Sequence, residues 1–241
     1  MEIQIGISKV NKYASSESGD TLEVTERPNG GLSIVLADGQ TSGRGAKAVS
    51  TQVVRRVISL LADGVRDGAA ARAASDALFS ERNGKVSATL NILSIDFQTS
   101  TIVITRNNPC PVMIIRDETM DLLNAESTPV GTTRNIRPSI CEIPLENDLT
   151  IVMYTDGLSQ AGERASRAID VETAIEAQIE DSDPSAQEVA DALLDQAIRL
   201  DDGRPSDDIS VVVLRVMSGL EDNIRRMTVR LPVQPLDIKN P

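Results

Sequence analysis

The chain has 241 residues, which is enough for one large domain or two small ones around a sizeable core. Its net charge of −12 argues against a nucleic-acid partner and against binding to anionic membrane surfaces, because both need a basic face. The absence of histidine excludes Ser-His-Asp and Cys-His triads and histidine-bound zinc.

Nothing in the sequence indicates export or membrane insertion. Residues 1–5 do not form a basic region followed by an apolar one, so we expect no signal peptide. No apolar run approaches the roughly 18 residues that a membrane span needs. Two cysteines, Cys110 and Cys141, are too few for a disulfide framework and indicate free thiols. These features predict a cytoplasmic protein.

The first third of the chain predicts three strands and then a helical hairpin. Alternating or apolar runs indicate strands over 1–13, 21–26 and 31–37, and the turn signal Pro28-Asn29-Gly30 joins the last two as a β-hairpin. Apolar positions at helical spacing follow over 45–62, and alanines dominate 67–79.

The remainder predicts short strands, two helices and a last strand. The short, closely spaced strands favour antiparallel pairing and cover 86–96, 101–105, 112–116, 120–123, 138–143 and 150–155. Helices are expected over 170–181 and 184–200, with Pro184 in the first turn of the second. An apolar run at 211–216 suits a strand covered on both faces, and 227–233 is a short extended stretch. The fold class is therefore α+β, with helices covering antiparallel sheets.

Aspartates recur at the ends of these strands. Asp38 and Asp156 each follow an apolar strand, Asp207 and Asp208 precede the last one, and Asp20 comes just before the hairpin. Carboxylate oxygens suit hard cations such as Mg²⁺ and Mn²⁺, and close carboxylates repel one another unless a cation lies between them. Four such aspartates could hold two ions and share a water for phosphoryl chemistry.

Each of these signals also has an ordinary structural explanation. Asp-Gly is the commonest hairpin turn, so Asp38-Gly39 or Asp156-Gly157 taken alone indicates a turn. Two further pairs, which begin at Asp63 and Asp67, are interpreted as plain turns at helix ends. From the residues alone, the turn and the metal site both remain open.

The residues of these motifs, and the order of the motifs along the chain, resemble those of a known family. The chain resembles the PPM family of metal-dependent, protein phosphatase 2C-like enzymes, and most of all the bacterial branch typified by the stage-II-sporulation E phosphatase. The resemblance spans about residues 6–217. Four segments carry it in the family order: Ser18-Gly19-Asp20, residues 35–46 around Asp38-Gly39, residues 153–158 around Asp156-Gly157, and residues 206–213 around Asp207-Asp208.

The resemblance implies a fold and a domain organisation. The fold would be an αββα sandwich, two antiparallel sheets with helices outside. Residues 1–217 would form the catalytic domain, and the tail at 218–241 is a candidate for packing on it. The helical hairpin at 45–82 looks like a regulatory element of this branch, with a plain packing role as the alternative.

The resemblance also implies a metal centre and a reaction. Asp38 would bridge two Mn²⁺ or Mg²⁺ ions, with the Gly39 carbonyl as a further ligand. Asp156 and Asp207 would hold one ion and Asp20 the other, with Asp38 and Asp156 as the catalytic pair. A water bridging both ions would attack phosphorus directly. The substrate would be a phosphoserine or phosphothreonine of a protein, with the anti-sigma-factor antagonist of a partner-switching pathway as a candidate.

One departure and two alternatives accompany this interpretation. Many family members use a histidine to protonate the leaving oxygen and an arginine to bind phosphate; here histidine is absent, and Lys9, Lys12 and Arg44 are candidate phosphate contacts. One alternative is a catalytically inactive relative that binds a phosphoprotein. The other is a metal-dependent hydrolase of small phosphorylated compounds.

Overall fold

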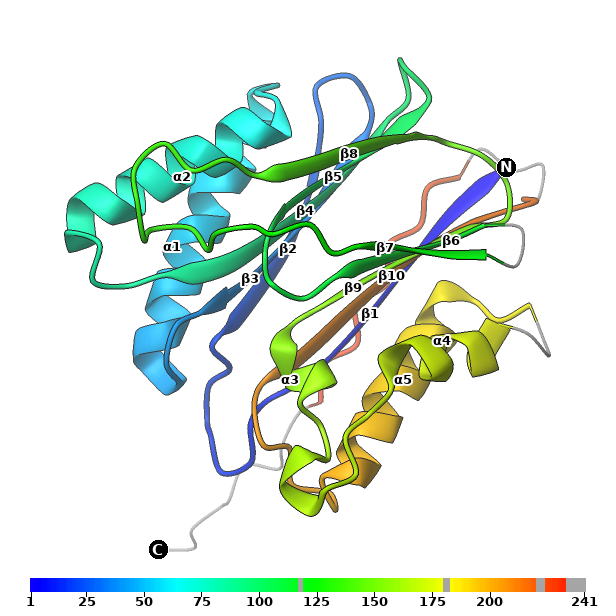
Figure 1. Cartoon of the computed structure of the whole chain (residues 1–241). Coiled ribbons are helices and arrows are strands. Elements are labelled where there is room, and N and C mark those ends of the chain that lie inside the picture. The colour runs from blue at the N-terminus through cyan, green and yellow to red at the C-terminus, as the bar shows by residue number, and fades with distance from the viewer. Residues whose placement is uncertain (117–118, 180–182, 220–223, 233–241) are drawn as a thin grey trace, which may run out of the picture.

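The computed structural model describes residues 1–116, 119–179, 183–219 and 224–232. Within these residues, two five-stranded sheets pack face to face, and a helix pair covers the outer face of each (Figure 1). All neighbouring strands run antiparallel. The predicted α+β class and αββα sandwich are confirmed.

The two sheets draw their strands from different parts of the chain. The strands of the first sheet lie in the order β1 (Glu2–Val10), β10 (Ile209–Met217), β9 (Leu149–Tyr154), β6 (Val112–Arg116) and β7 (Thr119–Leu123). Those of the second sheet lie in the order β2 (Asp20–Glu26), β3 (Leu32–Gly39), β4 (Ala88–Asp96), β5 (Thr101–Asn107) and β8 (Ser139–Pro144). The chain therefore crosses between sheets several times, which brings distant strand ends together.

The helices close an outer core on each side. The hairpin of α1 (Gly43–Ala62) and α2 (Asp67–Arg82) covers the second sheet, and α4 (Val171–Ile179) and α5 (Ala186–Leu200) cover the first (Figure 1). Two short helical turns, α3 (Asp156–Ser159) and a 3₁₀ turn (Glu163–Ala165), lie between β9 and α4. The helices are amphipathic, so their apolar faces supply the outer cores.

Strand β10 shows why the sandwich forms. Its side chains point alternately to the two faces of the sheet, and both faces are covered, so its residues are buried almost throughout. Val211 and Val213 pack into the helix-covered core, whereas Val212 and Leu214 pack between the two sheets. A continuous apolar run is what a strand covered on both faces requires, so this prediction is confirmed.

Two local predictions were wrong. Helix α5 begins at Ala186, and Pro184 lies outside its first turn; Ser185 caps the helix by a reciprocal capping box with Glu188. Asp67 is not in a plain turn: it is buried at the start of α2, where Arg27 Nη1 donates to its Oδ1 at 2.9 Å. Helix α4 ends at Ile179, and residues 180–181 of the predicted helix lie outside the described residues.

The C-terminal tail is described only in part. Residues 224–232 are exposed and carry no regular secondary structure, and residue 233 of the predicted extended stretch lies outside the described residues. Arg225 donates to the Glu26 carboxylate and to the Gly30 carbonyl. The division at 217/218 stays a prediction. None of the helices in the described ranges has the length and apolarity to cross a membrane.

Candidate metal centre

Aspartates from both sheets meet at one end of the sandwich. Asp20 is the first residue of β2 and pairs directly with Asp38 in β3. Asp156 follows β9 and opens α3, and Asp207 precedes β10, the neighbour of β9. The negative charges of Asp20, Asp156 and Asp207 all contribute to a raised pKa of Asp38.

Asp20 connects the two sheets. Its carboxylate is fully buried, and its Oδ2 accepts hydrogen bonds from Thr155 Oγ1 at 3.0 Å and from Ser210 Oγ at 2.6 Å. Both hydroxyls belong to the opposite sheet's strand ends. The other oxygen, Oδ1, is buried and has no hydrogen-bond partner among the described residues. A buried carboxylate oxygen without a donor is costly, which indicates a place for a cation.

The carboxylates raise one another's pKa values. Burial raises the pKa of Asp38 well above its ordinary range, and the negative charges of Asp20, Asp156 and Asp207 raise it further. Burial and then Asp207 raise the pKa of Asp156. Burial also raises the pKa of Asp20, although the two hydroxyls oppose this. Such a set of repelling carboxylates favours either a proton or a cation among them.

Two lysines converge on the backbone of Asp20. Lys9 Nζ and Lys47 Nζ donate to the Asp20 carbonyl at 2.6 and 2.9 Å, and burial lowers the pKa of Lys9. The sequence reasoning proposed Lys9 but missed Lys47, because a lysine in an amphipathic helix looks like an ordinary solvated residue. Lys47 therefore ties helix α1 to the chain beside the cluster.

The other two candidate phosphate contacts already have acidic partners. Lys12 Nζ lies 3.7 Å from the Asp207 carboxylate. Arg44 Nε lies 3.8 Å from Glu17, and its side chain is 88% exposed. Lys12 thus adds positive charge next to Asp207, whereas Arg44 pairs with Glu17.

Asp208 holds the backbone in place. Its Oδ1 accepts from the Lys12 backbone N–H at 2.9 Å, and its Oδ2 accepts from the Gly19 N–H at 2.7 Å. Both oxygens are thus used to fix the loop between β1 and β2, immediately before Asp20. Asp207 Oδ1 instead accepts from the Asp208 backbone N–H at 3.0 Å and lies 3.7 Å from Lys12 Nζ, and the negative charge of Asp207 raises the pKa of Asp156.

Neither Asp-Gly pair is a hairpin turn. Asp38-Gly39 ends β3, and Asp156-Gly157 opens α3. A Cβ on Gly39 would lie 2.1 Å from the Ala46 carbonyl oxygen, and one on Gly157 would lie 2.1 Å from the Asp208 carbonyl oxygen. Glycine is therefore needed for close backbone approach at both positions. The turn interpretation is wrong for both pairs.

A family model described as Stage II sporulation protein E (SpoIIE) matches residues 28–217. The chain belongs to the SpoIIE family. The Stage II sporulation protein E of Priestia megaterium is 21% identical over 214 residues, which cover 89% of this chain and 36% of the relative. The protein of that name from Bacillus subtilis (strain 168) is 22% identical over 215 residues, with coverage of 89% and 26%. This SpoIIE-family chain thus spans about a third or less of these relatives.

Solved structures agree with this family. The PP2C phosphatase domain of SpoIIE from Bacillus subtilis, solved with a fragment of its regulatory domain, gives a TM-score of 0.78 at 20% identity, over 91% of this chain and 64% of that one. PstP in complex with two manganese ions gives 0.69 at 18% identity, over 90% and 99%. RsbX in complex with magnesium gives 0.67 at 16%, over 88% and 94%. The SpoIIE-family chain therefore has the PP2C phosphatase fold, and the family prediction is confirmed.

The donors of this SpoIIE-family site fit divalent cations. The ligand candidates are carboxylate and carbonyl oxygens, and one of them, the buried Oδ1 of Asp20, has no hydrogen-bond partner among the described residues. Across the part of the chain that the structure describes, no three acidic, cysteine or histidine side chains are already gathered closely enough to form a ligand set. Binding would therefore require these carboxylates to turn toward a common point. A cation at that point would offset their mutual repulsion and so permit this rearrangement.

Proposed function

We propose that the chain is a divalent-cation-dependent protein serine/threonine phosphatase that hydrolyses phosphoserine and phosphothreonine. The observation that carries this proposal is the aspartate cluster at one end of a PP2C fold. Asp20 is buried there, and its Oδ1 has no hydrogen-bond partner in the part of the chain that the structure describes. The membership of the SpoIIE family supports the same activity.

Two Mn²⁺ or Mg²⁺ ions would be held by Asp38, Asp156, Asp207, Asp20 and the carbonyl of Gly39. When bound, they would supply positive charge for a phosphoryl group and acidify water at the site. Support for the metals comes from relatives of the same fold, because PstP was solved with manganese and RsbX with magnesium.

The chain's own residues prepare the site. Thr155 and Ser210 fix the orientation of the Asp20 carboxylate, which leaves Oδ1 for a cation. Lys9 and Lys12 add positive charge that favours an anionic phosphoryl group. Because the chain has no histidine, protonation of the leaving serine oxygen falls to water or to another acid.

The proposed substrate is a phosphorylated protein, and a candidate is the anti-sigma-factor antagonist of a partner-switching pathway. The similarity to RsbX and to a structure from a study of the bacterial stressosome supports this candidate. Residues 1–217 are the proposed catalytic domain, with 218–241 as its tail. The family match ends at residue 217, where β10 also ends.

The test is phosphate release from a phosphoserine protein with Mn²⁺, with Mg²⁺ and with chelator. We expect metal-dependent phosphate release that Asp38→Asn and Asp156→Asn both abolish. The control variant Asp63→Asn, which changes an exposed carboxylate at the end of α1, should have no effect. Metal-independent release, or full activity in both site variants, would refute the two-metal proposal. A folded chain that binds Mn²⁺ and phosphoprotein without turnover would support the inactive binding module instead.

A further inference from the structure

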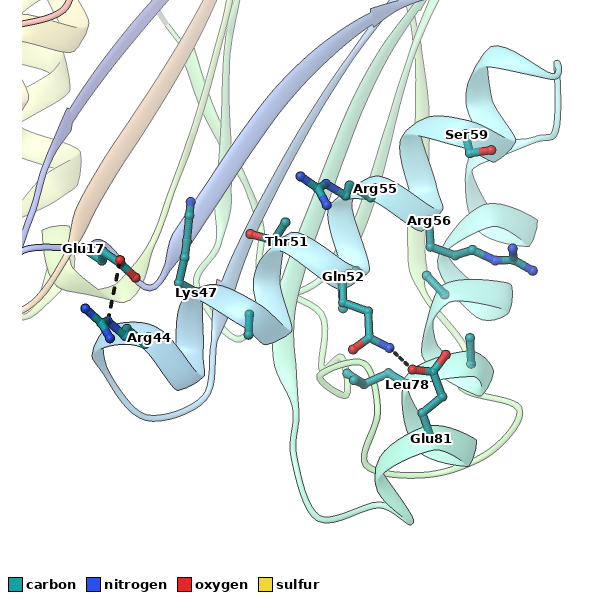
Figure 2. A pocket seen from close by; sticks show the side chains of 14 residues that line it. Glu17, Arg44, Lys47, Thr51, Gln52, Arg55, Arg56, Ser59, Leu78 and Glu81 are labelled. Atoms are coloured by element: carbon teal, nitrogen blue, oxygen red, sulfur yellow. Dashed lines mark hydrogen bonds and ion pairs between the residues drawn. The ribbon is translucent and has the colours of Figure 1, made fainter.

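The outer face of the α1–α2 hairpin carries a groove that the proposed metal centre does not explain. Its volume is about 880 Å³, and it runs along α1 beside α2 (Figure 2). The floor is apolar and includes Val53, Ala74 and Leu78. Polar side chains from the exposed face of α1 form its walls.

The charge of this groove is opposite to that of the whole chain. Four of its lining side chains are cationic and two are anionic, on a chain with a net charge of −12. The cations are Arg44, Lys47, Arg55 and Arg56; the anions are Glu17 and Glu81. Such a local excess of positive charge attracts anionic partners.

The two anions are already engaged, whereas two of the cations are not. Glu17 lies 3.8 Å from Arg44, and Glu81 accepts from Gln52 at 2.6 Å across the groove (Figure 2). Arg55 and Arg56 are exposed, and neither forms an ion pair with any residue that the structure describes. Their guanidinium groups are therefore available to carboxylates, which they bind in a bidentate geometry.

One end of the groove lies beside Asp20, one of the proposed metal ligands. Lys47 lines the groove and also donates to the Asp20 carbonyl, and Figure 2 shows its side chain pointing toward the strands. Helix α1 rises about 1.5 Å per residue, so Arg55 lies about 12 Å along the helix from Lys47. An extended peptide covers this span with about four residues.

We propose that this groove binds an acidic segment of the phosphoprotein substrate, about four to six residues from the phosphorylated side chain. Arg55 and Arg56 contact its carboxylates, and the apolar floor takes a neighbouring side chain. This inference rests on the proposed phosphatase function for the position of the phosphoserine, but the binding of an acidic segment can be measured without turnover.

The first test is binding of fluorescent peptides to the full chain, followed by anisotropy in the presence of chelator. Two peptides of equal length carry either Asp and Glu or Asn and Gln about four to six positions from a serine. We expect the acidic peptide to bind about tenfold more tightly, with a preference that weakens as salt is added. Equal binding of both peptides, or equally tight binding of an oligothymidylate, would overturn the proposal.

Charge reversal assigns the preference to the groove. The variant Arg55→Glu/Arg56→Glu should lose the preference for the acidic peptide. The matched control Arg72→Glu/Arg199→Glu changes the net charge equally at exposed positions outside the groove and should keep it. Loss of the preference in both variants would mean that overall charge, rather than this groove, attracts the peptide, and would overturn the proposal.

Turnover separates this proposal from the phosphatase function. With phosphoserine versions of both peptides, kcat/KM of the wild-type chain should be about tenfold higher for the acidic one, and the groove variant should remove the difference. The kcat/KM of the groove variant for p-nitrophenyl phosphate should equal that of the wild-type chain. Acidic-peptide binding without any phosphate release would refute the phosphatase function and leave the groove assignment standing.

Discussion

Asp20 and Asp38 lie directly opposite each other in the antiparallel β2–β3 pair. Like charges at directly opposite positions destabilise a sheet, and burial makes this pair more costly. The two carboxylates therefore destabilise the β2–β3 pair in which they lie. A bound cation would relieve that cost, which links the stability of the fold to the occupancy of the proposed site.

The metal-free chain should lose stability as the pH rises. Burial and neighbouring carboxylates raise the pKa of Asp38 from its ordinary 3.8 to about 9, so the folded chain keeps a proton that the unfolded chain has already released. Unfolding then releases this proton, and the free energy of unfolding falls across the window between those two values. Denaturant unfolding in chelator from about pH 5 to about pH 8 measures this slope.

The variant Asp38→Asn removes the titrating group and should flatten this pH dependence. It should also make the metal-free chain more stable near neutral pH, because the amide is neutral without a proton, whereas folding of the wild-type chain must place a proton on Asp38. Asp63→Asn changes an exposed carboxylate and serves as the control, which should keep the wild-type slope. Identical slopes in wild type and Asp38→Asn would contradict the prediction.

The hydroxyls of Thr155 and Ser210 should tune metal affinity through Asp20. Each donates to Asp20 Oδ2 and so keeps Oδ1 free. Thr155→Val or Ser210→Ala should weaken Mn²⁺ binding by about 10–100-fold, as is usual for groups that orient metal ligands. Calorimetric titration with Mn²⁺ measures this loss, and Thr155→Ser should restore most of it. Unchanged affinity in both variants would show that Asp20 needs no such support.

The sequence could predict the strand ends because their signals are local. The apolar run of β10 and the aspartates that follow or precede strands need only a few neighbouring residues to be recognised. The order of the four motifs along the chain then indicated the protein family. The four-residue helix α3 was missed, because so short an element shows no helical period.

The supports of the site could not be predicted, because they depend on how the two sheets meet. Thr155 and Ser210 are 135 and 190 residues from Asp20 in the chain, so no spacing reveals their contacts. The same holds for Asp67, whose partner Arg27 is 40 residues away. Asp67-Gly68 looked like a turn because only the tertiary structure buries it beside an arginine.

The adjacent residues Asp207 and Asp208 should fail in different ways. Asp208 accepts two backbone hydrogen bonds, so Asp208→Asn places an amide donor against a donor and should cost about 1–3 kcal/mol of stability. Asp207→Asn should leave stability nearly unchanged, because its ion pair with Lys12 is partly exposed, but should abolish metal-dependent phosphate release. Thermal unfolding and activity of both variants test this. Equal losses of stability would refute the division of roles.

Gly39, like Gly157, is a glycine of the site at which the structure leaves no room for a side chain. A Cβ there would lie 2.1 Å from the Ala46 carbonyl oxygen, and Ala46 is fully buried, so the first turns of α1 would have to move away from β3. We expect Gly39→Ala to cost about 1–3 kcal/mol and to lower phosphate release, because Asp38 and Lys47 would move with their elements. The control is Gly45→Ala in the same turn of α1, where the nearest atom, Thr41 Oγ1, is 3.9 Å away and alanine favours the helix. If Gly39→Ala unfolds at the same denaturant concentration as Gly45→Ala and keeps full activity, the close approach of α1 has no role in forming the site.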